Sequence, residues 1–283
     1  MNDNTTHRTT LVLGGTGKTG RRVVERLEAR GLPVRVGSRS GDPPFDWEDE
    51  TTWAPALEGV GAVYLTYYPD FALPGAIEAT QSFAELAIES GAPRLVLLSG
   101  RGEPLAERGE EVIRNTGAEL TILRSTWFMQ NLSEDYMREH VLSGEIRLPA
   151  GDVPTPFLDA DDIADVATAA LTDDRHVGRL YELTGPRSLT LAQVAAEISE
   201  VVGREVRYVP ISIEQHAAEA AEHGAPLELI ELLTYLFTEV VDGRNAQTTD
   251  GVRRALGRQA RDFRDFARAA ATNGAWDPAP INA

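Results

Sequence analysis

The sequence contains no cysteine and only one lysine among its 283 residues. Without cysteine the chain can form no disulfide, no thiolate nucleophile and no cysteine metal site. Its five histidines are scattered, without the paired spacing of metal ligands, so we predict no metal site. No apolar run reaches the roughly 20 residues that cross a bilayer, and the polar N-terminus is unlike a signal peptide. We therefore expect a cytoplasmic protein that does not enter membranes.

Positive charge is also scarce, since 27 basic residues face 44 acidic ones and the formal net charge is −17. Phosphate backbones and anionic lipids would repel such a surface, so the charge argues against nucleic-acid and membrane partners. The 42% hydrophobic content is typical of a globular chain, long enough for one large α/β domain with a smaller lobe. We expect a small-molecule substrate and a monomer or homodimer.

In the first half, short apolar runs alternate with amphipathic stretches of helical length. The apolar runs are Thr10–Leu13, Val34–Val36, Ala62–Leu65, Leu95–Leu98 and Leu120–Leu123, and the helical stretches include Arg21–Arg30, Ile77–Glu89 and Leu105–Asn115. Continuous apolar runs are typical of strands buried on both faces of a parallel sheet. The alternation predicts an α/β fold with a doubly wound, Rossmann-type parallel sheet, whose carboxyl strand ends form the ligand-binding edge.

After about residue 145 the pattern changes to a turn-rich link. Beyond it we predict strands at Leu180–Leu183 and Val206–Val209, and helices at Asp161–Leu171, Leu189–Val202 with Ser188 as a candidate cap, Glu228–Val240, Gly251–Leu256 and Phe263–Ala271. We place a soft boundary near residue 150. Residues 1–150 would form a dinucleotide-binding domain, and residues 151–283 a mostly helical substrate lobe packed on the sheet edge within one structural unit.

The sharpest motif is a glycine-rich turn between the first predicted strand and the first helix. Glycines at positions 14, 17 and 20 fit G-x-x-G-x-x-G, and those at 15, 17 and 20 fit G-x-G-x-x-G. Both patterns serve a tight turn, close approach of a pyrophosphate to bare backbone, and close packing of a helix on a strand. The free amides and dipole of the helix N-terminus then favour phosphate. The turn therefore predicts a dinucleotide site.

The end of the second predicted strand favours NADP(H) over NAD(H). An NAD site usually has an acidic residue there to bind the ribose hydroxyls. No acidic residue occurs before Asp42, whereas Ser38 and Arg39 directly follow the strand. A guanidinium can bind a 2′-phosphate with two parallel charge-assisted hydrogen bonds.

Segments spread over most of the chain resemble the NmrA-like branch of the atypical short-chain dehydrogenase/reductase superfamily, and within it the reductases of ergot-alkaloid biosynthesis. The segments that carry the likeness are Gly14–Gly20, Val36–Ser40 leading to Phe45-Asp46-Trp47, Leu123–Asn131 with its Trp-Phe-Met-Gln-Asn, Phe157–Asp165 and Arg261–Phe266. The resemblance implies a Rossmann-type fold, NADP(H) as cofactor and a reductase activity.

The resemblance also implies roles for individual positions. Cofactor-binding residues would be Gly14, Thr16, Gly17, Lys18, Thr19 and Gly20 at the pyrophosphate, Ser38 and Arg39 at the 2′-phosphate, Asp46 and Trp47 beside the adenine, Thr66 and Tyr67 at the ribose or nicotinamide, and Ser99 where the superfamily often has its catalytic serine. Trp127 and Phe128 would form the wall of the nicotinamide and substrate pocket, with Asn131 holding the loop.

The chain departs from the superfamily in one chemical respect. Standard members transfer a proton through a tyrosine and a lysine four residues later. The only lysine is Lys18, position 14 is a glycine, and no tyrosine occurs between Ser99 and Trp127. Reduction of a ketone creates an alkoxide that needs a proton donor, whereas hydride simply neutralises an iminium ion. The sequence therefore favours an imine or iminium acceptor, with conjugated alkenes and quinones left open.

Two tyrosines and a carboxylate follow the run Ala62–Leu65. Tyr67, Tyr68 and Asp70 would lie at the ligand edge, where Tyr67 could donate a proton or stack on the substrate. The alternative is that one tyrosine only packs under the loop. We therefore take Tyr67, Trp127 and Phe128 as the candidate catalytic residues.

The leading hypothesis is an NADPH-dependent reductase of secondary metabolism that transfers hydride to an imine, an iminium ion or a polarised double bond. Two alternatives keep the same fold. One is an NADP(H)-sensing regulatory protein, and the other is a cyclase or isomerase that turns over without consuming cofactor.

Overall fold

The computed structural model describes residues 8–134 and 137–277, so residues 1–7 lie outside the described part. The chain forms two compact units, each of which combines segments distant in the sequence. The first unit holds the residues up to Ser125 together with Ala160–Leu183 and Gly251–Arg258, and the second holds Thr126–Asp159, Thr184–Asp250 and the residues from Gln259 onward. Within the described ranges, no helix has the length and apolar character that a bilayer crossing demands.

The first unit is built on the predicted parallel sheet. Its six strands have the order β2-β1-β3-β4-β5-β7, and every neighbouring pair is parallel. The strands are β1 (Thr9–Leu13), β2 (Val34–Gly37), β3 (Val60–Leu65), β4 (Arg94–Gly100), β5 (Glu119–Ser125) and β7 (Leu180–Leu183). The predicted fold class is confirmed, and the carboxyl ends of all six strands lie at one edge.

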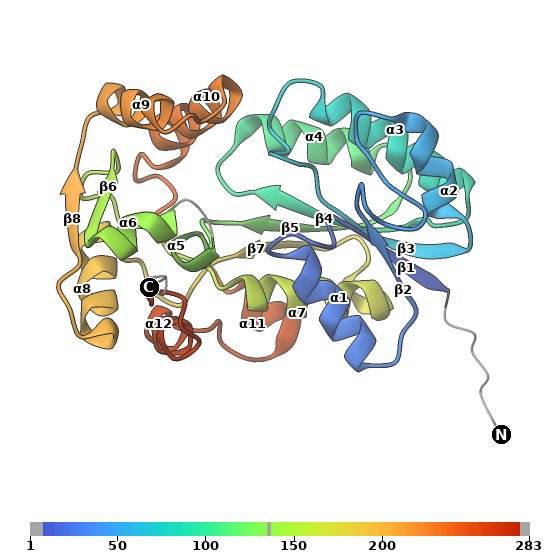
Figure 1. The fold of residues 1–283 in the computed structure, drawn as a ribbon. Coiled ribbons are helices and arrows are strands. Elements are labelled where there is room, and N and C mark those ends of the chain that lie inside the picture. Colours follow the sequence, from blue (N-terminus) through green and yellow to red (C-terminus); the bar gives the residue numbers. More distant parts are fainter. Residues whose placement is uncertain (1–7, 135–136, 278–283) are drawn as a thin grey trace, which may run out of the picture. The chain divides into compact units, whose positions relative to one another are not determined.

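Helices cover both faces of this sheet (Figure 1). One face carries α1 (Gly20–Ala29), α7 (Ala160–Thr172) and α11 (Gly251–Leu256), and the other carries α2 (Trp53–Leu57), α3 (Ala76–Glu89) and α4 (Pro104–Arg114). An ion pair joins α1 to α7, because Arg26 binds Asp165 at 2.5 Å and Asp161 at 2.6 Å. Short 3₁₀ turns occur at Glu50–Thr52 and Asp174–His176.

Helices bury both faces of the sheet, and the strands are therefore rich in apolar residues. Leu11, Val63, Leu97 and Ile122 are almost fully buried and belong to one hydrophobic core. Burial on both faces removes the alternation of polar and apolar residues that an exposed sheet would show. This explains why the strand positions could be predicted from apolar runs alone.

The second unit contains a two-stranded parallel pair and several helices. The strands are β6 (Glu145–Leu148) and β8 (Arg207–Pro210), and the helices are α5 (Asn131–Glu134), α6 (Met137–Ser143), α8 (Leu191–Val202), α9 (Ile213–Glu222), α10 (Leu227–Tyr235) and α12 (Phe263–Thr272). β8 was predicted, but its partner β6 begins the segment that we expected to be a link. Only Ile146 and Leu148 are buried in β6, so its alternating pattern is too short to stand out.

Two helix boundaries also differ from the predictions. Helix α8 begins at Leu191, where Thr190 and Gln193 form a capping box. Ser188 is therefore not the cap, and its hydroxyl instead bonds the carbonyl of Ala246. The stretch predicted as one helix up to Val240 divides into α10 and a π-helix at Leu236–Val240.

Candidate functional site

The turn between β1 and α1 is a cradle of glycines. Gly14 has a φ of +59°, a conformation that side chains other than hydrogen rarely adopt. The amide of Gly17 donates to the carbonyl oxygen of Gly14 at 2.8 Å and closes the turn. A Cβ atom on Gly20 would lie 2.1 Å from that same oxygen. Only glycine therefore lets the helix begin so close to the strand.

The N-terminus of α1 offers its amides to an anion. Thr19 occupies the N-cap position without a side-chain hydrogen bond to the helix, and the first turn contains no acidic residue. Thr16 and Gly17 are exposed at the turn, whereas Thr19 and Gly20 are buried. Exposed backbone at a helix N-terminus without a cap favours phosphate through its N–H groups and dipole. The turn thus fits the diphosphate of a dinucleotide.

The segment after β2 is folded into a tight loop. The carbonyl oxygen of Ser38 accepts hydrogen bonds from the amides of Gly41 and Phe45, at 3.0 and 2.9 Å. The Ser38 hydroxyl lies 3.4 Å from that of Ser40. Arg39 is exposed on this loop. A guanidinium here is free to approach a phosphate, and the assignment of Ser38 and Arg39 to the 2′-phosphate stays a prediction.

Trp47 connects this loop to the end of β3. Its Nε1 donates to the carbonyl oxygen of Thr66 at 3.2 Å, and its ring centroid lies 5.0 Å from that of Tyr67. The carbonyl oxygen of Asp46 accepts a bond from Trp53 at 2.8 Å. The structure thus brings four predicted cofactor residues together at one sheet edge. Burial raises the pKa of Tyr67, so its phenol stays protonated at neutral pH.

Ser99 lies inside the first unit, in a polar network. Its hydroxyl donates to Glu110 at 2.6 Å, and Arg124 binds the same carboxylate with two nitrogens. Both Ser99 and Glu110 are buried. This network joins β4, α4 and β5. The Ser99 hydroxyl therefore has its proton bound to Glu110. A contact between Ser99 and the cofactor stays a prediction.

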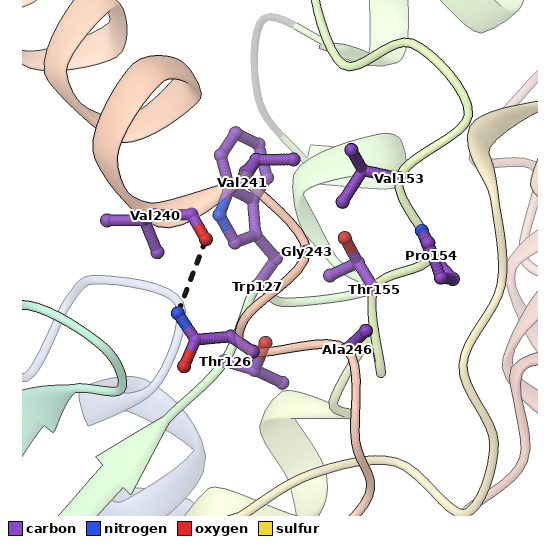
Figure 2. A pocket seen from close by; sticks show the side chains of 10 residues that line it. Thr126, Trp127, Val153, Pro154, Thr155, Val240, Val241, Gly243 and Ala246 are labelled. Atoms are coloured by element: carbon purple, nitrogen blue, oxygen red, sulfur yellow. Dashed lines mark hydrogen bonds between the residues drawn. The ribbon is translucent and has the colours of Figure 1, made fainter.

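Trp127 and Phe128 belong to the second unit, whereas Tyr67 belongs to the first. Trp127 lines a small apolar pocket with Pro154, Thr155 and Val240 (Figure 2). Asn245 also lines this pocket, and its side-chain amide donates to the carbonyl oxygen of Val240 at 3.3 Å. The cavity volume is about 10 Å³, room for roughly one water molecule. An organic ring could enter only if the lining side chains moved.

The π-helix Leu236–Val240 supplies an aromatic contact to Trp127, which lines this pocket. The ring centroid of Phe237 lies 5.0 Å from that of Trp127 and 5.3 Å from that of His216. Burial lowers the pKa of His216, so the imidazole is neutral at pH 7. Phe128 forms a backbone bridge with Leu158. The rings packed in series beside Trp127, those of Phe237 and His216, are therefore both neutral at pH 7.

The match to known proteins decides the family. The profile of the NmrA-like family matches residues 108–265 of the chain. The chain is 33% identical to agroclavine dehydrogenase of Claviceps fusiformis over 91% of its own length and 96% of that protein's. This chain belongs to the NmrA-like family. The likeness to reductases of ergot-alkaloid biosynthesis, predicted from the sequence, is confirmed.

Other relatives of this NmrA-like chain agree with the predicted reductase class. NAD(P)H azoreductase of Xenophilus azovorans is 32% identical over 92% of the chain and 96% of that protein. The structure is similar to that of Citrobacter sp. triphenylmethane reductase complexed with NADP(H), with a TM-score of 0.74 and 20% identity, over 93% of this chain and 99% of that one. At that identity the second likeness concerns the fold alone.

Two residues of the NmrA-like chain came to light only in the structure. Phe237 contacts Trp127 although the two lie far apart in the sequence, and no pattern links them. Glu103 is buried at the start of α4. Pro104 directly after it is a signal of a helix start, so the N-cap position of Glu103 could have been read from the sequence. Its burial could not.

Proposed function

We propose that this chain is an NADPH-dependent reductase that transfers hydride to an imine, an iminium ion or another polarised double bond of a small organic molecule. The glycine turn carries the proposal. Gly20 lies so close to Gly14 that a Cβ would sit 2.1 Å from the carbonyl oxygen, and the helix N-terminus behind it has no side-chain cap. Such bare backbone is suited to a dinucleotide diphosphate.

The exposed Arg39 supports the preference for NADP(H). It lies two residues after the end of β2, and the chain has no acidic residue between the end of that strand and Asp42. We assign Arg39 to the 2′-phosphate because a carboxylate there would repel that group and a guanidinium binds it with paired hydrogen bonds. Ser38, fixed by its carbonyl bonds to Gly41 and Phe45, would add a hydroxyl contact.

The bound dihydronicotinamide would supply the hydride, and the protein's task is to hold and orient both reactants. We assign Thr66 and Tyr67 to the ribose and nicotinamide, since they follow β3 at the same edge as the glycine turn. Trp127 and Phe128 would give the acceptor an apolar aromatic wall. Relatives named as reductases of alkaloids and azo compounds support a ring-bearing organic acceptor.

The absence of a tyrosine-lysine pair in the sequence supports an acceptor other than a simple ketone. Lys18 is the only lysine, and it lies in the glycine turn before α1. The residue four positions before it is Gly14, so Lys18 has no tyrosine there to assist. Acceptors whose reduction leaves a neutral amine or a delocalised anion suit such a site better than those that leave an alkoxide.

The test has two stages. Titration with NADPH and NADH, followed by tryptophan fluorescence, should give tighter binding of NADPH. Stopped-flow loss of NADPH absorbance is then recorded with panels of cyclic imines, enones and quinones, and at least one panel should be reduced. Binding of NADPH with no turnover on any panel would contradict a reductase and favour the sensing alternative. Product formation without loss of NADPH would favour a cyclase or isomerase.

A further inference from the structure

Two carboxyl side chains lie at the ligand edge of the sheet in the first unit. Asp70 follows β3, and Glu103 follows β4 at the start of α4. β3 and β4 are parallel neighbours, so both carboxyl groups lie at the edge that also holds the glycine turn. Glu103 is only 7% exposed. Asp70 is predicted at this edge from the sequence, whereas no local pattern marks Glu103 as a site residue.

Glu103 is oriented in a way that helix stability does not explain. It occupies the N-cap of α4, yet its carboxylate makes no capping hydrogen bond. The side chain instead lies over Gly100, where a Cβ atom would be 1.8 Å from Oε1. Oε2 is buried without a hydrogen-bond partner among the described residues. A carboxylate turned away from the helix amides loses their stabilisation, which favours the acid form with its O–H group.

Asp70 keeps that proton on Glu103. Burial raises the pKa of Asp70 as well, and the hydrogen bond that its Oδ1 accepts from the amide of Ala72 at 2.8 Å opposes that rise. This bond favours ionisation of Asp70 over ionisation of Glu103, whose Oε2 has no hydrogen-bond partner among the described residues. Burial and the negative charge of Asp70 together raise the pKa of Glu103 to about 8. Two neighbouring carboxyl groups with little solvent hold one proton between them at neutral pH. The pair is therefore a protonated acid beside a carboxylate.

Arg101, Glu107 and Glu110, the charged residues of this region with ion pairs, bind partners other than Glu103. Glu107 and Glu110 both bind Arg124, at 3.4 and 2.6 Å. Arg101 lies 3.4 Å from Glu182. The side chain packed on α4 from the loop after β3 is the apolar Phe71, whose ring would clash with any Cβ on Gly109. Asp70 is thus the charged residue that acts on Glu103, and no described cation neutralises the pair.

We propose that Glu103 is the proton donor of the reductase, with Asp70 as its positioning residue, and that the acceptor is a conjugated carbonyl compound or quinone. This inference rests on the proposed function and narrows its substrate class. The acceptor gains a hydride from the dihydronicotinamide at its electrophilic carbon, and its π electrons move to the carbonyl oxygen. The O–H bond of Glu103 breaks and the proton passes to the resulting enolate or phenolate. Glu103 leaves the step as a carboxylate and regains a proton from water.

The pair of Glu103 and Asp70 favours one of the acceptor classes that the sequence left open. An iminium ion becomes a neutral amine on hydride transfer and needs no acid at this place. A delocalised oxyanion does need one, and a general acid with a pKa near the working pH is the efficient donor. A buried acid held beside a carboxylate at the ligand edge is thus suited to an enone or quinone.

The experiment compares Glu103→Gln and Asp70→Asn with Glu111→Gln, an exposed carboxylate on the same helix. The substrates are a cyclic enone, a para-quinone and a cyclic iminium salt, each with saturating NADPH. For Glu103→Gln we expect kcat with the enone to fall by about 10² or more, with KM within about threefold of the wild type. Turnover of the iminium salt and all activities of Glu111→Gln should be unchanged.

A second measurement does not depend on turnover. Infrared spectra recorded across a pH series should show a protonated-carboxyl band that titrates near pH 8 in the wild type. The band should be absent in Glu103→Gln and should titrate at lower pH in Asp70→Asn, which lacks the like charge. The same spectra of the NADP⁺ complex show whether the proton stays in place when the cofactor binds.

The outcomes distinguish a failure of this inference from a failure of the proposed reductase function. Wild-type activity with the enone, together with a Glu103→Gln variant within about twofold of it, would overturn the donor and leave the reductase. A loss confined to the iminium salt would assign the pair to binding a cation instead, and overturn the donor as well. A wild type that binds NADPH and reduces none of the three acceptors would overturn the proposed function and, with it, this inference.

Discussion

Trp47 donates its indole N–H to the carbonyl oxygen of Thr66, at 3.2 Å. The bond fastens the loop after β2 to the residue that follows β3, and the ring centroid of Tyr67 lies 5.0 Å from that of Trp47. An indole in this position contacts both segments assigned to the adenosine and ribose. Trp47 should therefore report on cofactor binding.

Replacing Trp47 with Phe removes the donor and keeps an aromatic ring beside Phe45 and Phe83. We expect the free energy of unfolding to fall by about 1 kcal/mol, the usual worth of one hydrogen bond. The fluorescence change on NADPH binding should shrink strongly. Trp276→Phe is the matched control, because that indole also donates to a carbonyl, on Leu132. An undiminished response in Trp47→Phe would contradict the placement of the cofactor.

Two substitutions in the glycine turn should differ in their effects on stability and on NADPH binding. A Cβ on Gly20 meets backbone at 2.1 Å, so Gly20→Ala should both destabilise the protein and abolish NADPH binding. A Cβ on Gly17 meets its nearest backbone atom, the oxygen of Gly14, at 3.2 Å. Gly17→Ala should therefore weaken NADPH binding by about tenfold or more while the melting temperature falls by only a few degrees, roughly the effect of 1 kcal/mol. Calorimetric titration and thermal unfolding measure the two effects; unchanged affinity in Gly17→Ala would refute a diphosphate on this turn.

Arg39→Ala should separate the two nicotinamide cofactors. Hydrogen bonds to charged groups are worth about 1.5–3 kcal/mol, so we expect NADPH affinity to fall by roughly 10- to 100-fold. NADH affinity should change by less than about threefold, because NADH has no 2′-phosphate. Arg108→Ala, at an exposed arginine on α4, serves as the control for overall charge. Equal losses for NADPH and NADH would show that Arg39 does not bind the phosphate.

Stability should depend on pH through Glu103. Burial and Asp70 raise the pKa of Glu103 to about 8 in the folded protein, against about 4.3 in an unfolded chain. Between these values the folded state holds a proton that the unfolded state has released, so stability falls as pH rises through this window. Glu103→Gln should match the wild type near pH 4 and exceed it at pH 9 in urea denaturation. Glu111→Gln should run parallel to the wild type, and a parallel curve for Glu103→Gln would disprove the raised pKa.

Much of the first unit could be predicted because its strands are buried on both faces. The strands β3 and β4 contain the strong apolar runs Ala62–Leu65 and Leu95–Leu98, and each strand is followed by a helix with one buried face. Such local patterns need no knowledge of distant residues. The glycine turn is predictable for the same reason, since Gly14 and Gly20 are close in the sequence and their spacing encodes the clash that only glycine avoids.

Several features of the second unit could not be predicted from local sequence patterns. Strand β6 has only four residues, and its pairing with β8 depends on a segment some 60 positions later. The contact of Trp127 with Phe237 likewise joins distant parts of the chain. Short elements carry too little periodicity to be predicted, and the chain contains no mark that tells which distant segment will pack against them.

The sequence alone determined the parallel α/β fold, the glycine turn between β1 and α1, and the family, because each depends on residues that are neighbours along the chain. Only the tertiary structure decided that Ser99 donates to Glu110 and that Glu103 lies buried over Gly100, close enough to Asp70 to feel its charge. The acidity of a carboxyl group depends on the solvent it loses and on the charges brought near it. Folding sets both by placing strand ends side by side, and no spacing along the chain encodes them.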